Sequence, residues 1–145
     1  MKKNLMITLG MLVFILLVGN QIGFANQDNQ CAENFKAQQD GHGSTIYATN
    51  ALLNTVNTGL VFDEICKFLG SEGLQISSAN KQVGVISALQ HVNNSQKTAP
   101  LNVVVESVNY GSKISITFLT PAGLRSNTDD VAKFFCQIIG KAAMQ

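Results

Sequence analysis

The sequence predicts an α+β fold in which an antiparallel sheet of four to five strands carries two helices on one face. Residues 73–92 alternate apolar with small or polar side chains on both sides of a break at 80–82, the pattern of a β-hairpin. Residues 113–118 alternate in the same way, and segments 57–73 and 126–145 repeat apolar residues at helical spacing. Because two amphipathic helices need one apolar sheet face to cover, the expected order is β-α-β-β-β-β-α.

The first residues have the organisation of an export signal. Two lysines precede a strongly apolar stretch, and Gly23-Phe24-Ala25 places small residues at the two positions that a signal peptidase reads. We therefore interpret residues 1–25 as a signal peptide and expect a periplasmic or secreted protein. An uncleaved anchor is the alternative, although the apolar run is shorter than the roughly 20 residues of a membrane span.

Residues 26–43 are polar, so we expect a flexible N-terminal tail before a single domain at 44–145.

The chain after the predicted signal peptide is nearly neutral. The chain has ten basic and nine acidic residues, and loss of the two N-terminal lysines leaves eight against nine, a net charge of −1. No basic block remains, which argues against nucleic acid or an anionic membrane surface as a partner.

The predicted domain begins with a strand and contains two helices with recognisable N-terminal caps. The Thr, Tyr, Ile and Val content of segment 44–56 favours a strand, with an early helix as the alternative. The two predicted helices, 57–73 and 126–145, each start near an Asn-Thr pair, either member of which can cap the first turn.

The strands between the helices predict a sheet with two different faces, interrupted by a loop at 93–100. The face toward the helices should carry Leu74, Ile76, Ile86, Ala88, Leu101, Val103, Val105, Ile114, Ile116 and Phe118. The outer face should mix short polar residues with Val85, Leu89, Val104 and Val108. These four residues either belong to an ordinary solvated face, where scattered apolar residues are common, or form a surface for a protein partner.

Three cysteines follow the predicted cleavage point, so an oxidising compartment allows one disulfide and leaves one thiol over. We expect Cys66 to pair with Cys136, because the two helices should cover the same sheet face. Cys31 should then stay free in the tail or bond another chain. Unpaired, buried helix cysteines are the alternative. Neither His42 nor His91 has a metal-ligand spacing to a cysteine, so we expect no metal site and no cofactor.

The sequence contains no motif typical of a catalytic site. The stretch GHGS at 41–44 brings a histidine close to a serine, but without the strand-turn-helix context of a nucleophile elbow. The acidic pairs at 63–64 and 129–130 fit first turns of helices, where the helix dipole favours negative charge. We therefore expect that the protein is not an enzyme.

Three segments, "VFDEICKFLGSEGLQI", "VGVISALQ" and "FFCQIIGK", resemble parts of helix-grip domains in bacterial envelope lipoproteins. An example is the repeated domain of the lipoprotein C subunit of the outer-membrane barrel-assembly machinery. The chain departs from that family in having one domain and no lipidated cysteine, because Asp-Asn-Gln precedes Cys31. The resemblance implies a non-enzymatic envelope protein.

The sequence thus predicts an exported, non-enzymatic binding domain of the bacterial cell envelope, with an envelope protein as its partner. The alternative is a carrier of a small apolar ligand, and an enzyme is least favoured. A cavity between Phe118, Val105, Phe135 and Ile138 would indicate the carrier. A filled core beneath an apolar outer sheet face would indicate a protein-binding domain.

Overall fold

The predicted α+β class and antiparallel sheet are confirmed, but within the described residues the sheet has six strands and there are three helices. The computed structural model describes residues 26–55, 57–92 and 97–144, so the predicted signal peptide lies outside the described part. The elements are α1 (Asn26–Glu33), β1 (Lys36–Gln39), β2 (Thr45–Leu53), α2 (Thr58–Ser71), β3 (Gln75–Asn80), β4 (Val85–His91), β5 (Thr98–Val108), β6 (Gly111–Thr120) and α3 (Thr128–Ala142).

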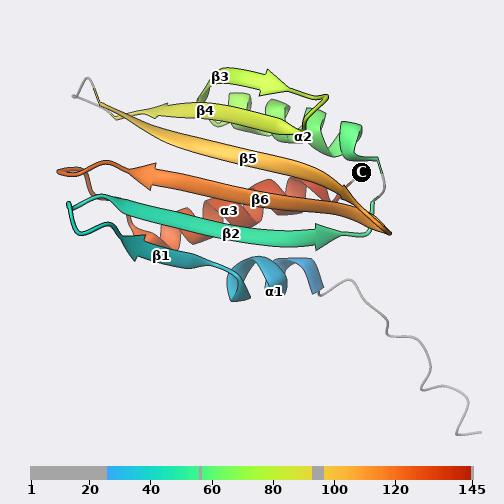
Figure 1. The fold of residues 1–145 in the computed structure, drawn as a ribbon, viewed down its shortest axis with the longest axis horizontal. Coiled ribbons are helices and arrows are strands. Elements are labelled where there is room, and N and C mark those ends of the chain that lie inside the picture. Colours follow the sequence, from blue (N-terminus) through green and yellow to red (C-terminus); the bar gives the residue numbers. More distant parts are fainter. Residues whose placement is uncertain (1–25, 56, 93–96, 145) are drawn as a thin grey trace, which may run out of the picture.

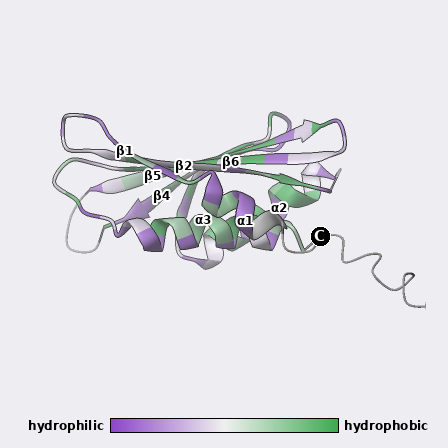
Figure 2. Ribbon diagram, turned by 90° about the horizontal axis from the view of Figure 1, so that it is seen from below, coloured by the Kyte–Doolittle hydropathy of each residue, from purple (hydrophilic) through white to green (hydrophobic). Residues whose placement is uncertain are grey.

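The molecule has two layers, one sheet and one layer of helices. The strand order is β1-β2-β6-β5-β4-β3, and every neighbouring pair is antiparallel. In Figure 1 the sheet faces the viewer and α2 and α3 lie behind it. Figure 2, turned by 90°, shows the helices on one side of the sheet and its other face uncovered.

The core lies between the sheet and the two longer helices. Eight of the ten predicted inner-face residues are buried, and the other two, Leu74 and Ile76, are half-buried against the core. The helices contribute Val61, Phe62, Ile65, Leu69, Phe135, Ile138, Ile139 and Ala142 to the same core. Asn57 and Asn127 cap α2 and α3 by accepting from first-turn backbone N–H groups, as predicted.

Residues 26–43 are not a flexible tail, and this prediction is wrong. They contain α1 and β1, and β1 pairs with the first half of β2. Before β1 begins, α1 covers the second half of the same edge of β2. Gln30 accepts from the backbone N–H of Leu52 at 3.0 Å, and Asn34 donates to the carbonyl of Asn50 at 3.0 Å. These hydrogen bonds to β2 order the segment. Its polar sequence alone does not predict them.

The expected pairing of Cys66 with Cys136 is also wrong. The disulfide joins Cys31 to Cys136, with their Cα atoms 5.6 Å apart, and Cys66 is the free thiol. The reason is that Cys136 on α3 faces α1, whose Cys31 is fully buried. The hydroxyl of Thr49 donates to the carbonyl of Cys31 at 2.7 Å, so this half-cystine is bound to the sheet as well.

The observed bounds of β2 and β5 decide one open alternative and correct one predicted loop. Residues 45–53 form a strand, so the early helix in segment 44–56 is excluded. The predicted loop at 93–100 is shorter than expected, because β5 begins at Thr98 and includes Pro100. Proline is tolerated there because the ladder to β6 begins only at Leu101.

The disulfide predicts a large difference between cysteine variants. Cys136→Ser should lower the free energy of unfolding by about 4 kcal/mol, because the lost cross-link closes a loop of roughly 100 residues. Cys66→Ser removes only a half-buried thiol and should have a much smaller effect. Chemical denaturation without reductant measures both, and equal losses would contradict the assigned bridge.

The alternation on β6 predicts unequal costs for neighbouring residues. Ile116 is fully buried, so Ile116→Ala should lower the free energy of unfolding by about 2–5 kcal/mol through lost burial and a residual cavity. Ser115 faces the uncovered side, and Ser115→Ala should stay within about 0.5 kcal/mol. Urea denaturation of the two variants would refute the assigned faces if their costs were similar.

The turn between β3 and β4 needs a glycine. Gly84 has φ +71°, and a Cβ there would clash with the carbonyl oxygen of Val105, whose own N–H donates to Gly84 at 2.8 Å. Gly84→Ala should therefore cost about 2 kcal/mol or more. Gly70 in α2 has no atom within 4 Å of such a Cβ, so Gly70→Ala should instead gain about 0.5–1 kcal/mol. Thermal unfolding of both variants tests this contrast.

Candidate functional site

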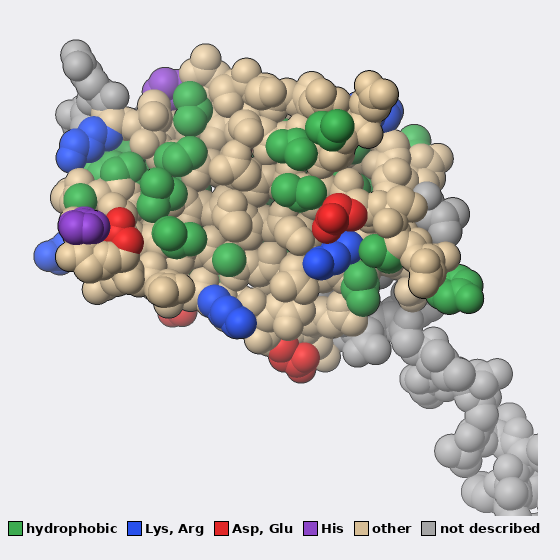
Figure 3. Space-filling model, in the orientation of Figure 1, with side chains coloured by type: hydrophobic (Ala, Val, Ile, Leu, Met, Phe, Trp, Pro, Cys, Tyr) green, Lys and Arg blue, Asp and Glu red, His purple; other side chains and the backbone are tan. Residues whose placement is uncertain are grey.

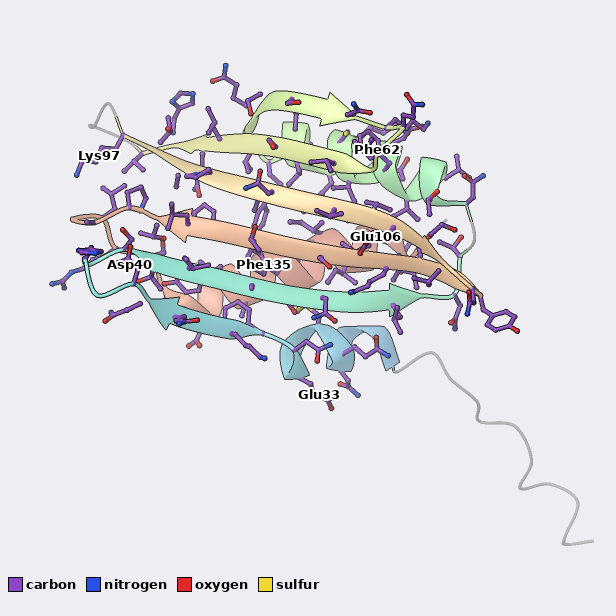
Figure 4. The ribbon with its side chains drawn as sticks, in the orientation of Figure 1. Glu33, Asp40, Phe62, Lys97, Glu106 and Phe135 are labelled. Atoms are coloured by element: carbon purple, nitrogen blue, oxygen red, sulfur yellow. A yellow bond between two sulfur atoms is a disulfide. The ribbon has the colours of Figure 1, made fainter. Side chains whose placement is uncertain are left out.

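A cavity of about 400 Å³ lies between the sheet and the helices where α2 ends and α3 begins. Leu101, Phe118 and Phe135 form its floor and are almost completely buried. Leu74, Val131 and Phe134 form half-buried apolar walls. We call this space the end cavity. Figure 4 labels Phe135, which lies on α3 behind the sheet.

The rim of the end cavity is polar and charged. Glu72 follows α2, Asp130 lies in the first turn of α3, and Arg125 lies in the loop between β6 and α3. All three side chains are exposed. Among the described residues, the Arg125 guanidinium makes no hydrogen bond or ion pair, so its donors remain available. The cavity thus combines an apolar floor with a rim that can bind a polar group.

The loop that carries Arg125 is fixed by hydrogen bonds to the end of the sheet. The hydroxyls of Thr120 and Ser126 are 2.6 Å apart, and Thr120 is buried. The hydroxyl of Tyr47 lies 3.4 Å from the carbonyl of Ser126, a weaker contact. Asn127 then caps α3, which sets the direction in which the helix leaves the loop. Arg125 therefore projects from a loop that is bound at both of its ends.

A second cavity of about 800 Å³ lies on the other side of this loop, near the turn between β1 and β2. Arg125 and Ser126 line both cavities. The second cavity is lined mainly by hydroxyls and small residues, including Thr45, Thr120 and Thr128. Its large apolar or aromatic lining residues are Tyr47 and Leu124, fewer than the six of the end cavity, so the end cavity is the better candidate for an apolar ligand.

A cavity between Phe118, Val105, Phe135 and Ile138, which would indicate a carrier, is only partly present. Phe118 and Phe135 line the end cavity, but Val105 and Ile138 do not, although both are buried in the core. The space is therefore displaced to one end of the helix layer.

The predicted partner surface lies on the uncovered face of the sheet, but it does not form one patch. Val85 and Val104 lie directly opposite each other on β4 and β5. Leu89 is separated from them by the row containing Ser87, and Val108 lies at the far end of β5, 37% exposed. The structure thus brings two of the four residues together.

The candidate catalytic residues have structural roles. Asp40 accepts from the backbone N–H groups of His42 and Ser44 at 2.9 Å each, and these bonds lower the pKa of its carboxyl. The motif at 41–44 is therefore an exposed turn between β1 and β2. Asp129 and Asp130 lie in the first turn of α3, as predicted.

The other acidic pair is not in the first turn of its helix, which corrects the expectation. Asp63 accepts from Lys81 at 2.6 Å and Glu64 from Lys67 at 2.6 Å, and both ion pairs are exposed. In the described part of the chain, no three His, Cys, Asp or Glu side chains gather where they could hold a metal ion.

The free thiol is poorly suited to nucleophilic chemistry. Burial, with a smaller contribution from Asp63, raises the pKa of Cys66 above its ordinary value. The group is therefore held as the protonated thiol at neutral pH, and the thiolate is the reactive form.

The residues that sequence reasoning missed are those of the cavity rim and several on the uncovered face. Glu72 and Arg125 were not singled out, because single charged residues near helix ends are common. Ile46 and Leu119 were missed because segment 44–56 was ambiguous and the alternation of β6 was followed only to Phe118. Following that alternation one residue further would have placed Leu119 outside.

No protein family model and no curated protein matches the chain. A solved structure of a conserved protein of unknown function from Enterococcus faecalis is similar, with a TM-score of 0.52 and 6% sequence identity over 81% of this chain and 79% of that one. Ara h 8.0201 aligns with a TM-score of 0.43 and 10% identity over 70% of this chain and 97% of that one. The first likeness shows the fold alone, and the second is too weak for any argument.

Proposed function

We propose that the protein is an exported binding protein that holds a small amphipathic molecule in the end cavity. The observation that carries this proposal is the apolar floor of Leu101, Phe118 and Phe135 beneath a charged rim. The volume of about 400 Å³ is near the lower end of the range of small-molecule sites, which is about 300–1,000 Å³. The ligand's apolar body would cover the floor, and its polar group would meet Arg125.

Export is part of the proposal. The disulfide between Cys31 and Cys136 supports a non-reducing compartment outside the cytoplasm. None of the helices in 26–55, 57–92 and 97–144 is long and apolar enough to cross a membrane. A periplasmic or secreted location, and cleavage after Ala25, remain predictions from the N-terminal sequence.

A second candidate function is the binding of an envelope protein, as the resemblance to helix-grip lipoprotein domains implies. The uncovered sheet face favours this candidate, because an antiparallel sheet can leave one face free for contact. Its apolar residues fall into separate groups, however, whereas the end cavity is a single continuous site. We therefore place the small ligand first.

Blocking the end cavity should abolish ligand binding. The probe is 1-anilinonaphthalene-8-sulfonate, an aromatic amphiphile with an anionic head and environment-sensitive fluorescence. Val131→Trp should fill the cavity and reduce probe affinity at least about tenfold, since an occupied pocket loses its apolar contacts. Arg125→Gln should weaken binding about threefold to tenfold through loss of a charge-assisted hydrogen bond.

Val83→Trp is the matched control, because Val83 is 62% exposed in the turn between β3 and β4, away from the end cavity, and receives the same side chain. It should leave probe affinity unchanged. Equal loss with both tryptophan variants, or unchanged binding with Val131→Trp, would place the probe outside the end cavity. Native mass spectrometry of protein recovered from the exported fraction would then search for a resident ligand.

A further inference from the structure

We propose that the uncovered sheet face binds a second copy of this chain, with the two-fold axis of the dimer running along the strands between β5 and β6. This inference does not depend on the proposed ligand, because the end cavity lies on the helix side of the sheet. It rests on the strand registers, which fix how side chains are arranged on the uncovered face.

The registers arrange this face in four transverse rows. The rows are Leu89-Pro100-Leu119-Ile46, Ser87-Asn102-Thr117-Ala48, Val85-Val104-Ser115-Asn50 and Glu106-Lys113-Leu52, where Pro100 meets Leu119 by continuing the β5–β6 register one residue. The first row is apolar across four strands. Figure 3 shows hydrophobic side chains of this face in two groups with polar ones between them.

Two large apolar residues of these rows are exposed, and two charged residues have no partner within the described part of the chain. Ile46 and Leu52 leave 44% and 50% of their surface exposed. Glu106 and Lys113 are the charged residues of the four rows, and they are register partners. Neither forms an ion pair or hydrogen bond within the described part of the chain. Figure 4 shows Glu106 on the viewer's side of the sheet, away from the helices.

A two-fold axis between β5 and β6 makes the face complementary to itself. The rotation keeps each row at its own height and exchanges β5 with β6 and β4 with β2. Glu106 of each subunit then meets Lys113 of the other, and Pro100 meets Leu119. Leu89 meets Ile46 at the outer ends of the apolar row. Two opposite-charge contacts form at once, because the interface is isologous.

An axis that runs across the strands loses this match, because it places each strand over its own copy. An axis across the strands at the Asn102 row would place Glu106 and Lys113 over residues beyond the first row, where neither finds an opposite charge. When two sheets pack face to face in the aligned way, their strands cross at about −30°. At roughly 10 Å from the centre of the interface, this angle displaces a strand from the strand it faces by about one strand spacing. The long side chains of Glu106 and Lys113 can span such a shift, so the pairing survives the twist.

The test reverses the charge of Glu106 or of Lys113 in separate variants and then mixes the two variants. Sedimentation velocity on protein from the exported fraction should show a concentration-dependent dimer. Lys113→Glu and Glu106→Lys each replace two attractive contacts by two repulsive ones and should weaken the dimer at least about 100-fold. An equimolar mixture of the two variants should restore dimers, because each charge then meets its opposite across the axis.

The mixing experiment excludes an effect within one subunit, since neither variant regains its own Glu-Lys pair. Lys133→Glu, an exposed position on α3, is the matched control and should leave the dimer intact. Thermal unfolding confirms that the variants are folded. A wild-type monomer at about 100 μM, a dimer insensitive to both variants, or a mixture without heterodimers in native mass spectrometry would each overturn the proposal. Recovery of the monomer bound through this face to a different protein would overturn it as well.

Discussion

The alternation of side chains along β5 and β6 is the constraint on which the rest of the structure depends. Because the side-chain period of a strand is two, Ile114, Ile116 and Phe118 must all face one side once any of them is buried. The two amphipathic helices can bury their stripes only against that side. The opposite face is thereby left uncovered, so the candidate site and the contact surface follow from one pattern.

The inner face and the helices were largely predictable because their signals are local. Alternation, cap residues and helical spacing all lie within a few residues, and eight of the ten predicted inner-face residues are buried. The pairing of Cys31 with Cys136 was not predictable, since a disulfide depends on a Cα distance that only the folded chain defines. The order in α1 and β1 likewise comes from contacts with β2 and α3, which are distant in sequence.

The sequence named the residues around which a cavity would indicate a carrier, but it did not predict that a cavity exists. Two of those four residues, Phe118 and Phe135, line the end cavity. Its location depends on where α2 ends, where α3 begins and how the loop at Arg125 is bound. Hydrophobic periodicity leaves the ends of a helix uncertain by one or two residues, so it cannot determine these features.

Strand β6 physically separates the two proposed activities. Phe118 faces the end cavity, while its neighbours Thr117 and Leu119 face the uncovered side. A ligand that contacts Phe118 therefore touches no atom of the proposed dimer surface, and the charge variants at Glu106 and Lys113 change no residue of the cavity. Ligand binding and self-association can consequently fail or succeed independently, which makes each experiment a test of its own surface.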